Sequence, residues 1–212
     1  MRFFALAIVC VCTLFSLNIG CQPPASITAS STVVGQTEVV LSSNTTTVGG
    51  QGKSTEKAGV ALTVADLAKL EETIKSKAGK VVVVDIWSLS CAPCMREFPH
   101  LVELSKRYPD RVACVSLNVD YIGLKSKPPE SYLPAAQEFL NKQQATLTNL
   151  LSSATDEAVL AKFKLESIPA ILIFGLDGKQ LHTLTDTNTG DDGLTYVGDV
   201  IPKIDALLAS QK

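Results

Sequence analysis

The sequence predicts an α/β domain in which a central mixed β-sheet is flanked by helices. Runs of β-branched and aliphatic residues without alternation, at 81–86 and 112–117, are typical of strands that are buried on both faces of a sheet. Segments with helical spacing separate these runs, and Asp177-Gly178 is a hairpin signal between two later strands. Strands that alternate with helices, followed by a hairpin and a last helix, define this fold class.

The first half of the domain is expected to hold two helices and two strands. Thr63 can cap the first helix and Gly79 can end it. The strand 81–86 follows, then a helix that starts at a pair of cysteines and ends before Pro109, then the strand 112–117. The apolar positions of the first helix recur at helical spacing: Leu67, Leu70 and Ile74.

The second half is expected to alternate in the same way. Pro134 and Pro202 fall in the first turns of two of its helices, where proline is tolerated. Its elements are, in order, a loop, a helix, a short connecting segment, a helix, two strands and a closing helix, at 121–129, 133–142, 146–151, 156–163, 170–174, 179–184 and 200–209.

The N-terminus indicates export. Residues 3–19 carry no charge and follow Met1-Arg2, as in the positive and apolar regions of a secretory signal. The small residue Gly20 directly before Cys21 is typical of a bacterial lipoprotein signal, in which the cysteine thiol is acylated. We therefore expect residues 1–20 to be a signal peptide of the lipoprotein type. A cleaved signal without lipid and an uncleaved membrane anchor remain alternatives.

The segment 21–57 is expected to be a flexible tether, because its Ser, Thr and Gly residues bury too little apolar surface to offset the conformational entropy of folding. Only residues 32–41 could pair as a strand. The folded domain should then cover 58–212, and the 46% hydrophobic content of the whole chain suffices for one core. The net charge of −2 and the scattered lysines favour no nucleic acid partner.

Two cysteines, Cys91 and Cys94, stand at the expected start of a helix. Three interpretations compete: a zinc half-site, a structural disulfide and a reversible redox pair. A zinc site needs four ligands, and the two histidines, His100 and His182, are isolated, so we expect no metal. A bridge over so short a loop constrains little of the unfolded chain. A thiol at a helix N-terminus favours the thiolate, which makes Cys91 a nucleophile and lets Cys94 resolve the mixed disulfide.

With these residues the chain resembles the thioredoxin superfamily, and most closely its exported, membrane-tethered TlpA/ResA-like oxidoreductases. The resemblance covers about residues 60–212. It rests on Asp85 six residues before Cys91, the Trp before the motif, the Glu and Pro that follow it, and an Ile-Pro pair in the place of the family's cis-proline loop: Trp87, Glu97, Pro99, Ile168 and Pro169.

The resemblance implies a thioredoxin-like fold and a thiol–disulfide oxidoreductase, more often a reductant, whose only redox group is the disulfide itself. Asp85 would relay a proton to or from Cys94, and Glu97 would tune the cysteines. The residues expected to contact substrate are Trp87, Ala92, Pro93, Ile168 and Pro169. Two positions depart from the common pattern of the family. Ser90 stands where many relatives have Trp, and the dipeptide between the cysteines is Ala92-Pro93, where Gly-Pro or Glu-Pro is more common.

The implied partners are cysteine-containing exported proteins, apocytochrome c among them, and an upstream membrane thiol reductase. The implied location is the periplasmic side of the cytoplasmic membrane, with lipid on Cys21. A second hypothesis remains, in which the domain is a non-catalytic binding or scaffold module with a fixed disulfide. A copper-handling metallochaperone fits less well, because those relatives use CxxxC with a downstream His. Cys114, in mid-strand, is expected to be a buried and inert thiol.

Overall fold

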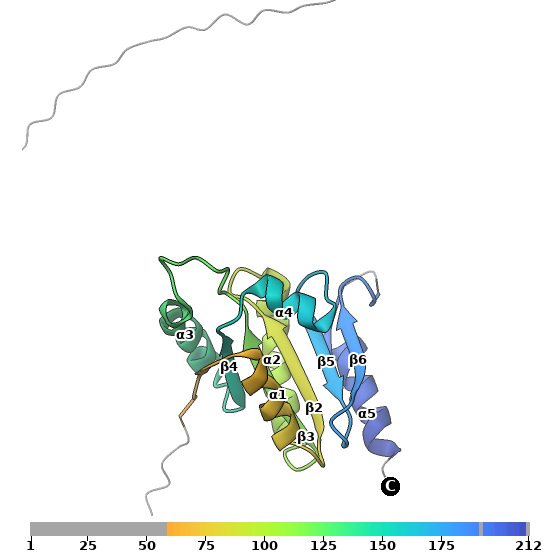
Figure 1. The fold of residues 1–212 in the computed structure, drawn as a ribbon. Helices are drawn as coiled ribbons and strands as arrows, with labels where there is room; N and C mark the ends of the chain where they lie inside the picture. The colour runs from red at the N-terminus through yellow and green to blue at the C-terminus, as the bar shows by residue number, and fades with distance from the viewer. Residues whose placement is uncertain (1–58, 191–192, 211–212) are drawn as a thin grey trace, which may run out of the picture. The chain divides into compact units, whose positions relative to one another are not determined.

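The computed structural model describes residues 59–190 and 193–210 of the chain (Figure 1). The predicted signal peptide, Cys21, the predicted tether and the candidate strand at 32–41 lie outside these residues. Among the described helices, none has the length and apolar character that crossing a bilayer requires.

The described residues form a mixed sheet of six strands in the order β1-β4-β3-β2-β5-β6. Strands β1, β4, β3 and β2 run parallel, whereas β5 pairs antiparallel with both β2 and β6. All seven residues of β2 are buried, which confirms the prediction from the unbroken valine run. The strands are β1 (Thr63–Ala65), β2 (Val81–Trp87), β3 (Val112–Asn118), β4 (Thr148–Ser152), β5 (Ala170–Phe174) and β6 (Gln180–Thr185).

Helices cover both faces of the sheet. Alternate residues of β2 point to opposite faces: Val83 packs in a core with α2, α3 and α5, and Val84 packs in a second core with α1 and α4. Figure 1 shows α1 and α4 in front of the sheet, with α2 and α5 behind it. The helices are α1 (Leu67–Ser76), α2 (Ala92–Arg107), α3 (Leu133–Gln143), α4 (Asp156–Phe163) and α5 (Ile201–Ala209). The prediction of a mixed sheet flanked by helices is confirmed.

The predicted cap of the first helix is wrong. Thr63 begins the short strand β1 and pairs with Leu150 of β4, so it is unable to cap α1. The cap is Asp66, whose Oδ1 accepts a hydrogen bond of 2.7 Å from the Lys69 backbone N–H. Helix α1 ends at Ser76, and Gly79 lies in the turn before β2 at a φ of +91°, a conformation that favours glycine.

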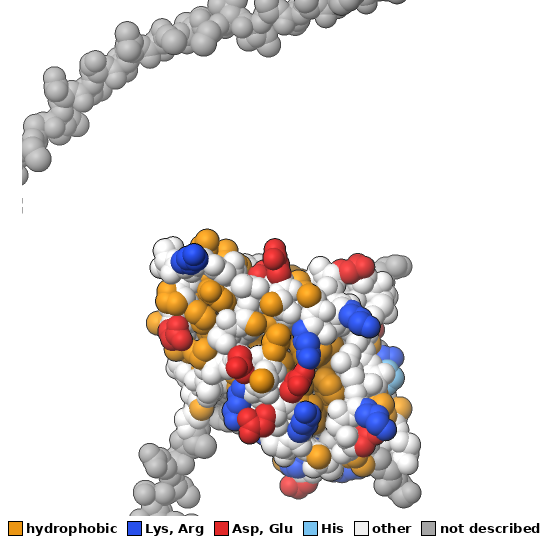
Figure 2. Space-filling model, viewed as in Figure 1, with side chains coloured by type: hydrophobic (Ala, Val, Ile, Leu, Met, Phe, Trp, Pro, Cys, Tyr) orange, Lys and Arg blue, Asp and Glu red, His pale blue; other side chains and the backbone are white. Residues whose placement is uncertain are grey.

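Three further elements differ from the prediction. The predicted connecting segment at 146–151 overlaps strand β4, which ends at Ser152. The loop after β3 ends in a 3₁₀ turn, η1 (Pro129–Tyr132), and a π-helical turn, η2 (Tyr196–Val200), precedes α5. Ile122 and Leu124, in the loop after β3, are exposed apolar residues, and Figure 2 shows hydrophobic side chains gathered over α3 and this loop.

Candidate functional site

The site is built at the junction between β2 and α2. Strand β2 ends at Trp87, and a short turn leads to Cys91, which is the N-cap residue of α2. The Cys91 backbone N–H donates to the carbonyl of Ser88 at 3.1 Å, which closes this turn. Ala92 and Pro93 form the first turn of α2, where the fixed φ of proline suits a helix start and its missing N–H costs no hydrogen bond. The prediction that a helix begins at the cysteine pair is confirmed.

Cys91 and Cys94 form a disulfide, with their Cα atoms 5.3 Å apart. The Cys94 backbone N–H donates to the Cys91 Sγ at 3.2 Å, so the first turn of α2 directs a donor at this sulfur. Cys91 is 9% exposed and Cys94 is 3% exposed. Cys91 is therefore the more exposed of the two residues, and its role as the nucleophile stays a prediction.

Asp85 lies on β2 and is almost completely buried, at 3% exposure. The pKa of this carboxyl is raised to about 7, mainly by burial; a hydrogen bond from Tyr196 lowers it, and the negative charge of Glu97 adds to the rise. The Tyr196 hydroxyl donates to Asp85 Oδ2 at 2.7 Å. With its pKa near 7, Asp85 is able to take up or release a proton at neutral pH.

Glu97 lies one turn into α2 and is linked to the same tyrosine. Its Oε2 accepts a hydrogen bond of 3.0 Å from the Tyr196 backbone N–H, and its side chain is 15% exposed. Tyr196 thus joins the two carboxylates, with its hydroxyl on Asp85 and its backbone on Glu97. Burial and the Asp85 charge raise the pKa of Tyr196 well above its usual value, so this hydroxyl keeps its proton and acts as a donor.

Tyr196 was not predicted from the sequence. It lies in the turn η2, 111 residues after Asp85 and 99 residues after Glu97, and no local pattern joins these positions. The one available signal is a single aromatic residue in an otherwise polar stretch before the last helix.

Trp87 is fully buried and therefore makes no direct contact with a docked substrate in this conformation. It packs against Phe98 of α2 and Phe139 of α3, with all three ring centroids 5.0 Å apart. The expectation that it binds substrate has to be corrected to a supporting role in the core beneath the motif. Its indole Nε1 is buried and has no hydrogen-bond partner among the described residues.

The other expected contact residues lie around the disulfide. Ala92 is exposed and Pro93 is half-buried. The Ile168–Pro169 peptide bond is cis, as the resemblance implied. Pro169 is buried, and Ile168 packs against the core cluster that contains both cysteines. Ile168 thus packs on the same core cluster as the cysteines although it is distant from them in the sequence, and contact of these residues with a substrate stays a prediction.

A hydrogen-bond network that the sequence did not reveal holds the turn before Cys91. Asp120 Oδ1 accepts from the Ser88 hydroxyl at 2.5 Å and from the Leu89 backbone N–H at 3.0 Å, and its Oδ2 accepts from Asn118 Nδ2 at 2.9 Å. Ser90 is hydrogen-bonded to Ser88 in the same network. A small cavity of about 130 Å³ lies here, between these residues and Ile168.

Cys114 lies within β3 and is 5% exposed. Burial, together with the charge of Asp85, raises the pKa of its thiol to about 12, which keeps it protonated and unreactive. The prediction of a buried thiol is confirmed. No group of three or more metal-binding side chains occurs within 59–190 and 193–210.

Comparison with known proteins extends this description. Residues 79–180 match a protein-family model described as Thioredoxin-like. The thioredoxin of Acidithiobacillus ferridurans is 32% identical over 93 residues, which cover 42% of this chain and 84% of that protein. The thiol-disulfide oxidoreductase ResA of Bacillus thuringiensis is 22% identical over 140 residues, which cover 66% of this chain and 74% of ResA.

Two other similarities are more limited. The thioredoxin-like protein YneN of Bacillus subtilis is 33% identical over 48 residues, and the chain spans only 28% of its length. The crystal structure of a secreted disulfide oxidoreductase of Mycobacterium tuberculosis, homologous to DsbE of E. coli, has a TM-score of 0.47 at 22% identity, and the match covers 62% of this chain and 85% of that one.

A disulfide pair at a strand-to-helix junction of a mixed sheet, in a chain related to ResA, defines a thiol–disulfide oxidoreductase. The chain belongs to the thioredoxin superfamily.

The raised pKa of Asp85 predicts how stability depends on pH. Below about pH 4 this carboxyl is protonated in the folded and the unfolded chain. Between the usual value of 3.8 and about 7 only the unfolded chain releases the proton, so stability falls as pH rises. Asp85→Asn should therefore leave stability nearly unchanged at pH 4 and raise it by on the order of 4 kcal/mol above pH 7. Urea unfolding of the oxidised protein from pH 4 to 9 measures this, with the exposed Asp110→Asn as control. An equal difference at every pH would contradict the account.

The Tyr196 hydrogen bond makes a second prediction. Tyr196→Phe removes the one donor that lowers the pKa of Asp85, so the fall in stability should continue to a pH above 7. The same unfolding series measures this shift. Tyr121→Phe is the matched control, because the Tyr121 hydroxyl makes no hydrogen bond to a described residue. A curve for Tyr196→Phe that runs parallel to the wild-type curve would refute the role given to this hydroxyl.

Proposed function

We propose that the chain reduces disulfides of exported proteins by exchange with the Cys91–Cys94 pair. The observation that carries this proposal is the pair itself: one disulfide at the N-terminus of α2, with the more exposed cysteine at the cap and the other cysteine in the first turn. An inert structural bridge would need neither this placement nor a carboxyl that titrates near neutral pH beneath it.

The exchange takes two steps. In the reduced protein the Cys91 thiolate attacks one sulfur of a substrate disulfide, and the other substrate sulfur leaves as a thiolate and takes up a proton. Cys94 then loses its proton and attacks Cys91 Sγ, which releases the second substrate sulfur and forms the Cys91–Cys94 disulfide. Two electrons pass from the protein to the substrate, which leaves as a dithiol.

The helix start favours the first step. The Cys94 backbone N–H already directs a hydrogen bond at Cys91 Sγ, and the positive end of the α2 dipole acts on the same atom. Both interactions stabilise a negatively charged sulfur more than a neutral one. The fold therefore supports Cys91 as the attacking sulfur.

The second step needs a proton acceptor for Cys94, and we assign this role to Asp85. Its carboxyl is buried and titrates near pH 7, and the Glu97 charge keeps its pKa raised. The substrate chain would dock over Ala92 and Pro93 and pair with the backbone at Ile168, beside Pro169. Half-buried Ile168 and exposed Ala92 support this surface.

The direction of transfer and the partners are proposed from the family resemblance, and the location is proposed from the N-terminal sequence. The TlpA/ResA-like resemblance favours a reductant, kept reduced by an upstream membrane thiol reductase. Export, a lipid anchor on Cys21 and action at the periplasmic side of the membrane follow from the N-terminal sequence. Apocytochrome c, with its CxxCH sites, is one substrate of the proposed kind.

Substitution of each cysteine separates catalysis from the scaffold hypothesis. Cys91→Ser should abolish turnover of DTNB and of insulin disulfides, whereas Cys94→Ser should accumulate a mixed disulfide through Cys91, because the resolving thiol is missing. Cys114→Ser is the matched control and should keep full turnover, since this thiol is buried and protonated. A scaffold would show no turnover in the wild type and unchanged partner binding in all three variants.

A titration against glutathione tests the direction. A reductant should have a potential well below that of protein disulfide isomerase, which is roughly −180 mV, and closer to the roughly −270 mV of thioredoxin. The fraction of oxidised pair at equilibrium is read by trapping the free thiols. A value near the roughly −120 mV of DsbA would make the protein an oxidant instead.

A further inference from the structure

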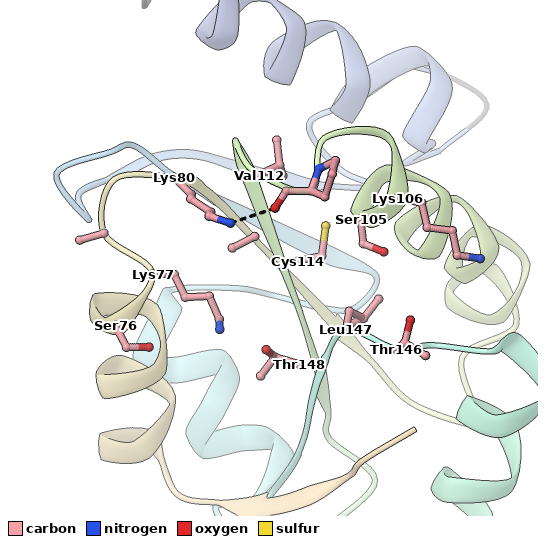
Figure 3. A pocket seen from close by; sticks show the side chains of 13 residues that line it. Ser76, Lys77, Lys80, Ser105, Lys106, Val112, Cys114, Thr146, Leu147 and Thr148 are labelled. Atoms are coloured by element: carbon pink, nitrogen blue, oxygen red, sulfur yellow. Dashed lines mark hydrogen bonds between the residues drawn. The ribbon is translucent and has the colours of Figure 1, made fainter. Parts of the chain in front are cut away.

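A hollow of about 630 Å³ opens at the end of the sheet where β2 and β3 begin (Figure 3). The ends of α1 and α2, the first residues of β3 and the segment that leads into β4 line it. The redox pair follows the opposite end of β2, and a strand of seven residues spans about 23 Å. A molecule in the hollow is therefore far from the disulfide.

The charges in this hollow have one sign. Lys77, Lys80 and Lys106 line it, and none of the 13 lining residues carries a carboxylate. Lys80 Nζ donates to the backbone carbonyl of Pro109 at 2.8 Å, the contact dashed in Figure 3. Lys77 and Lys106 make no ion pair and no side-chain hydrogen bond with any residue in 59–190 or 193–210. The chain as a whole has more acidic than basic residues, 21 against 19, so a surface without carboxylates is not a consequence of composition.

Attraction to the C-terminal ends of helices accounts for the positions of only some of these lysines. Lys77 is the C-cap residue of α1 and Lys106 lies in the last turn of α2, where the helix dipole attracts a cation. Lys80 lies outside both helices and turns into the same hollow. Lys77 and Lys80 are also half-buried, so part of each side chain lies against the wall of the hollow.

Hydroxyl groups complete the set of donors. The hydroxyls of Thr146 and Thr148 line the hollow and make no hydrogen bond to the described residues. Figure 3 shows the Lys77 side chain extending into the hollow on the side of Thr148. Lysines and threonines from three stretches of the chain, 77–80, 106 and 146–148, therefore line one hollow.

We propose that this hollow is a binding site for a phosphate group, carried by a small soluble molecule or by a phospholipid headgroup. Lysine binds phosphate as a point charge. The planar fork of arginine is the better match for a planar carboxylate, and no arginine lines the hollow. No aromatic residue lines it either, so a base or ring has nothing to stack on. The phosphate is the recognised part, and the site is independent of the redox reaction.

The test is binding by the full-length chain. Inorganic pyrophosphate is titrated by calorimetry, and vesicles of phosphatidylglycerol with phosphatidylcholine are compared with vesicles of phosphatidylcholine alone. Lys77→Ala and Lys80→Ala should each weaken binding about tenfold, the loss expected for one charge-assisted contact. The matched control is Lys125→Ala, an exposed lysine outside the hollow, which should bind as the wild type does. Turnover of DTNB by each variant confirms an intact fold.

The outcomes distinguish a soluble phosphate ligand from a phospholipid headgroup. Pyrophosphate binding that the hollow variants weaken supports a soluble phosphate ligand. No pyrophosphate binding, together with a preference for phosphatidylglycerol that the same variants lose, supports a lipid headgroup. Absence of both, or equal binding by Lys77→Ala and Lys125→Ala, overturns the site and leaves these lysines as partners of the helix ends alone.

Discussion

The chemistry of this domain depends on one constraint, which is that a fully buried strand ends directly at the start of a helix. Strand β2 is fixed by neighbours on both sides and by helices on both faces, so the turn after Trp87 has little freedom. Asp120 further restrains this turn by accepting hydrogen bonds from the Ser88 hydroxyl and the Leu89 backbone N–H. Cys91 is thereby held at the cap of α2, where a backbone N–H and the helix dipole both act on its sulfur.

Beneath this junction three segments meet in one polar network. Asp85 comes from β2, Glu97 from α2 and Tyr196 from the turn before α5, and the tyrosine is hydrogen-bonded to both acids. Burying a carboxylate costs free energy, and the second acid nearby increases this cost, so Asp85 holds its proton up to about pH 7. The domain accepts this destabilisation in its core, and the exchange proposed above would use this carboxyl as a proton acceptor.

The parts of the fold that could be predicted are those with a local signal. The valine run predicted β2, and the Asp177-Gly178 pair predicted the hairpin between β5 and β6. The proline of the cysteine motif lies in the first turn of α2, where proline is favoured. The cap at Thr63 failed because pairing with Leu150, distant in the sequence, made that residue part of a strand. Tyr196 and the lysine hollow were missed for the same reason: their residues are separated by dozens of positions and become neighbours only when the sheet forms.

The state of the Cys91 sulfur in the reduced protein is the most direct measure of the central claim. Alkylation by iodoacetamide is followed across a pH series, and the modified residue is identified by mass spectrometry. We expect Cys91 to react ahead of Cys94 and Cys114, and at a pH below the roughly 8.5 at which a free cysteine ionises. A sulfur at residue 91 that is no more reactive than a cysteine in an unstructured peptide, or that the reagent is unable to reach, would contradict the assignment of an electron carrier.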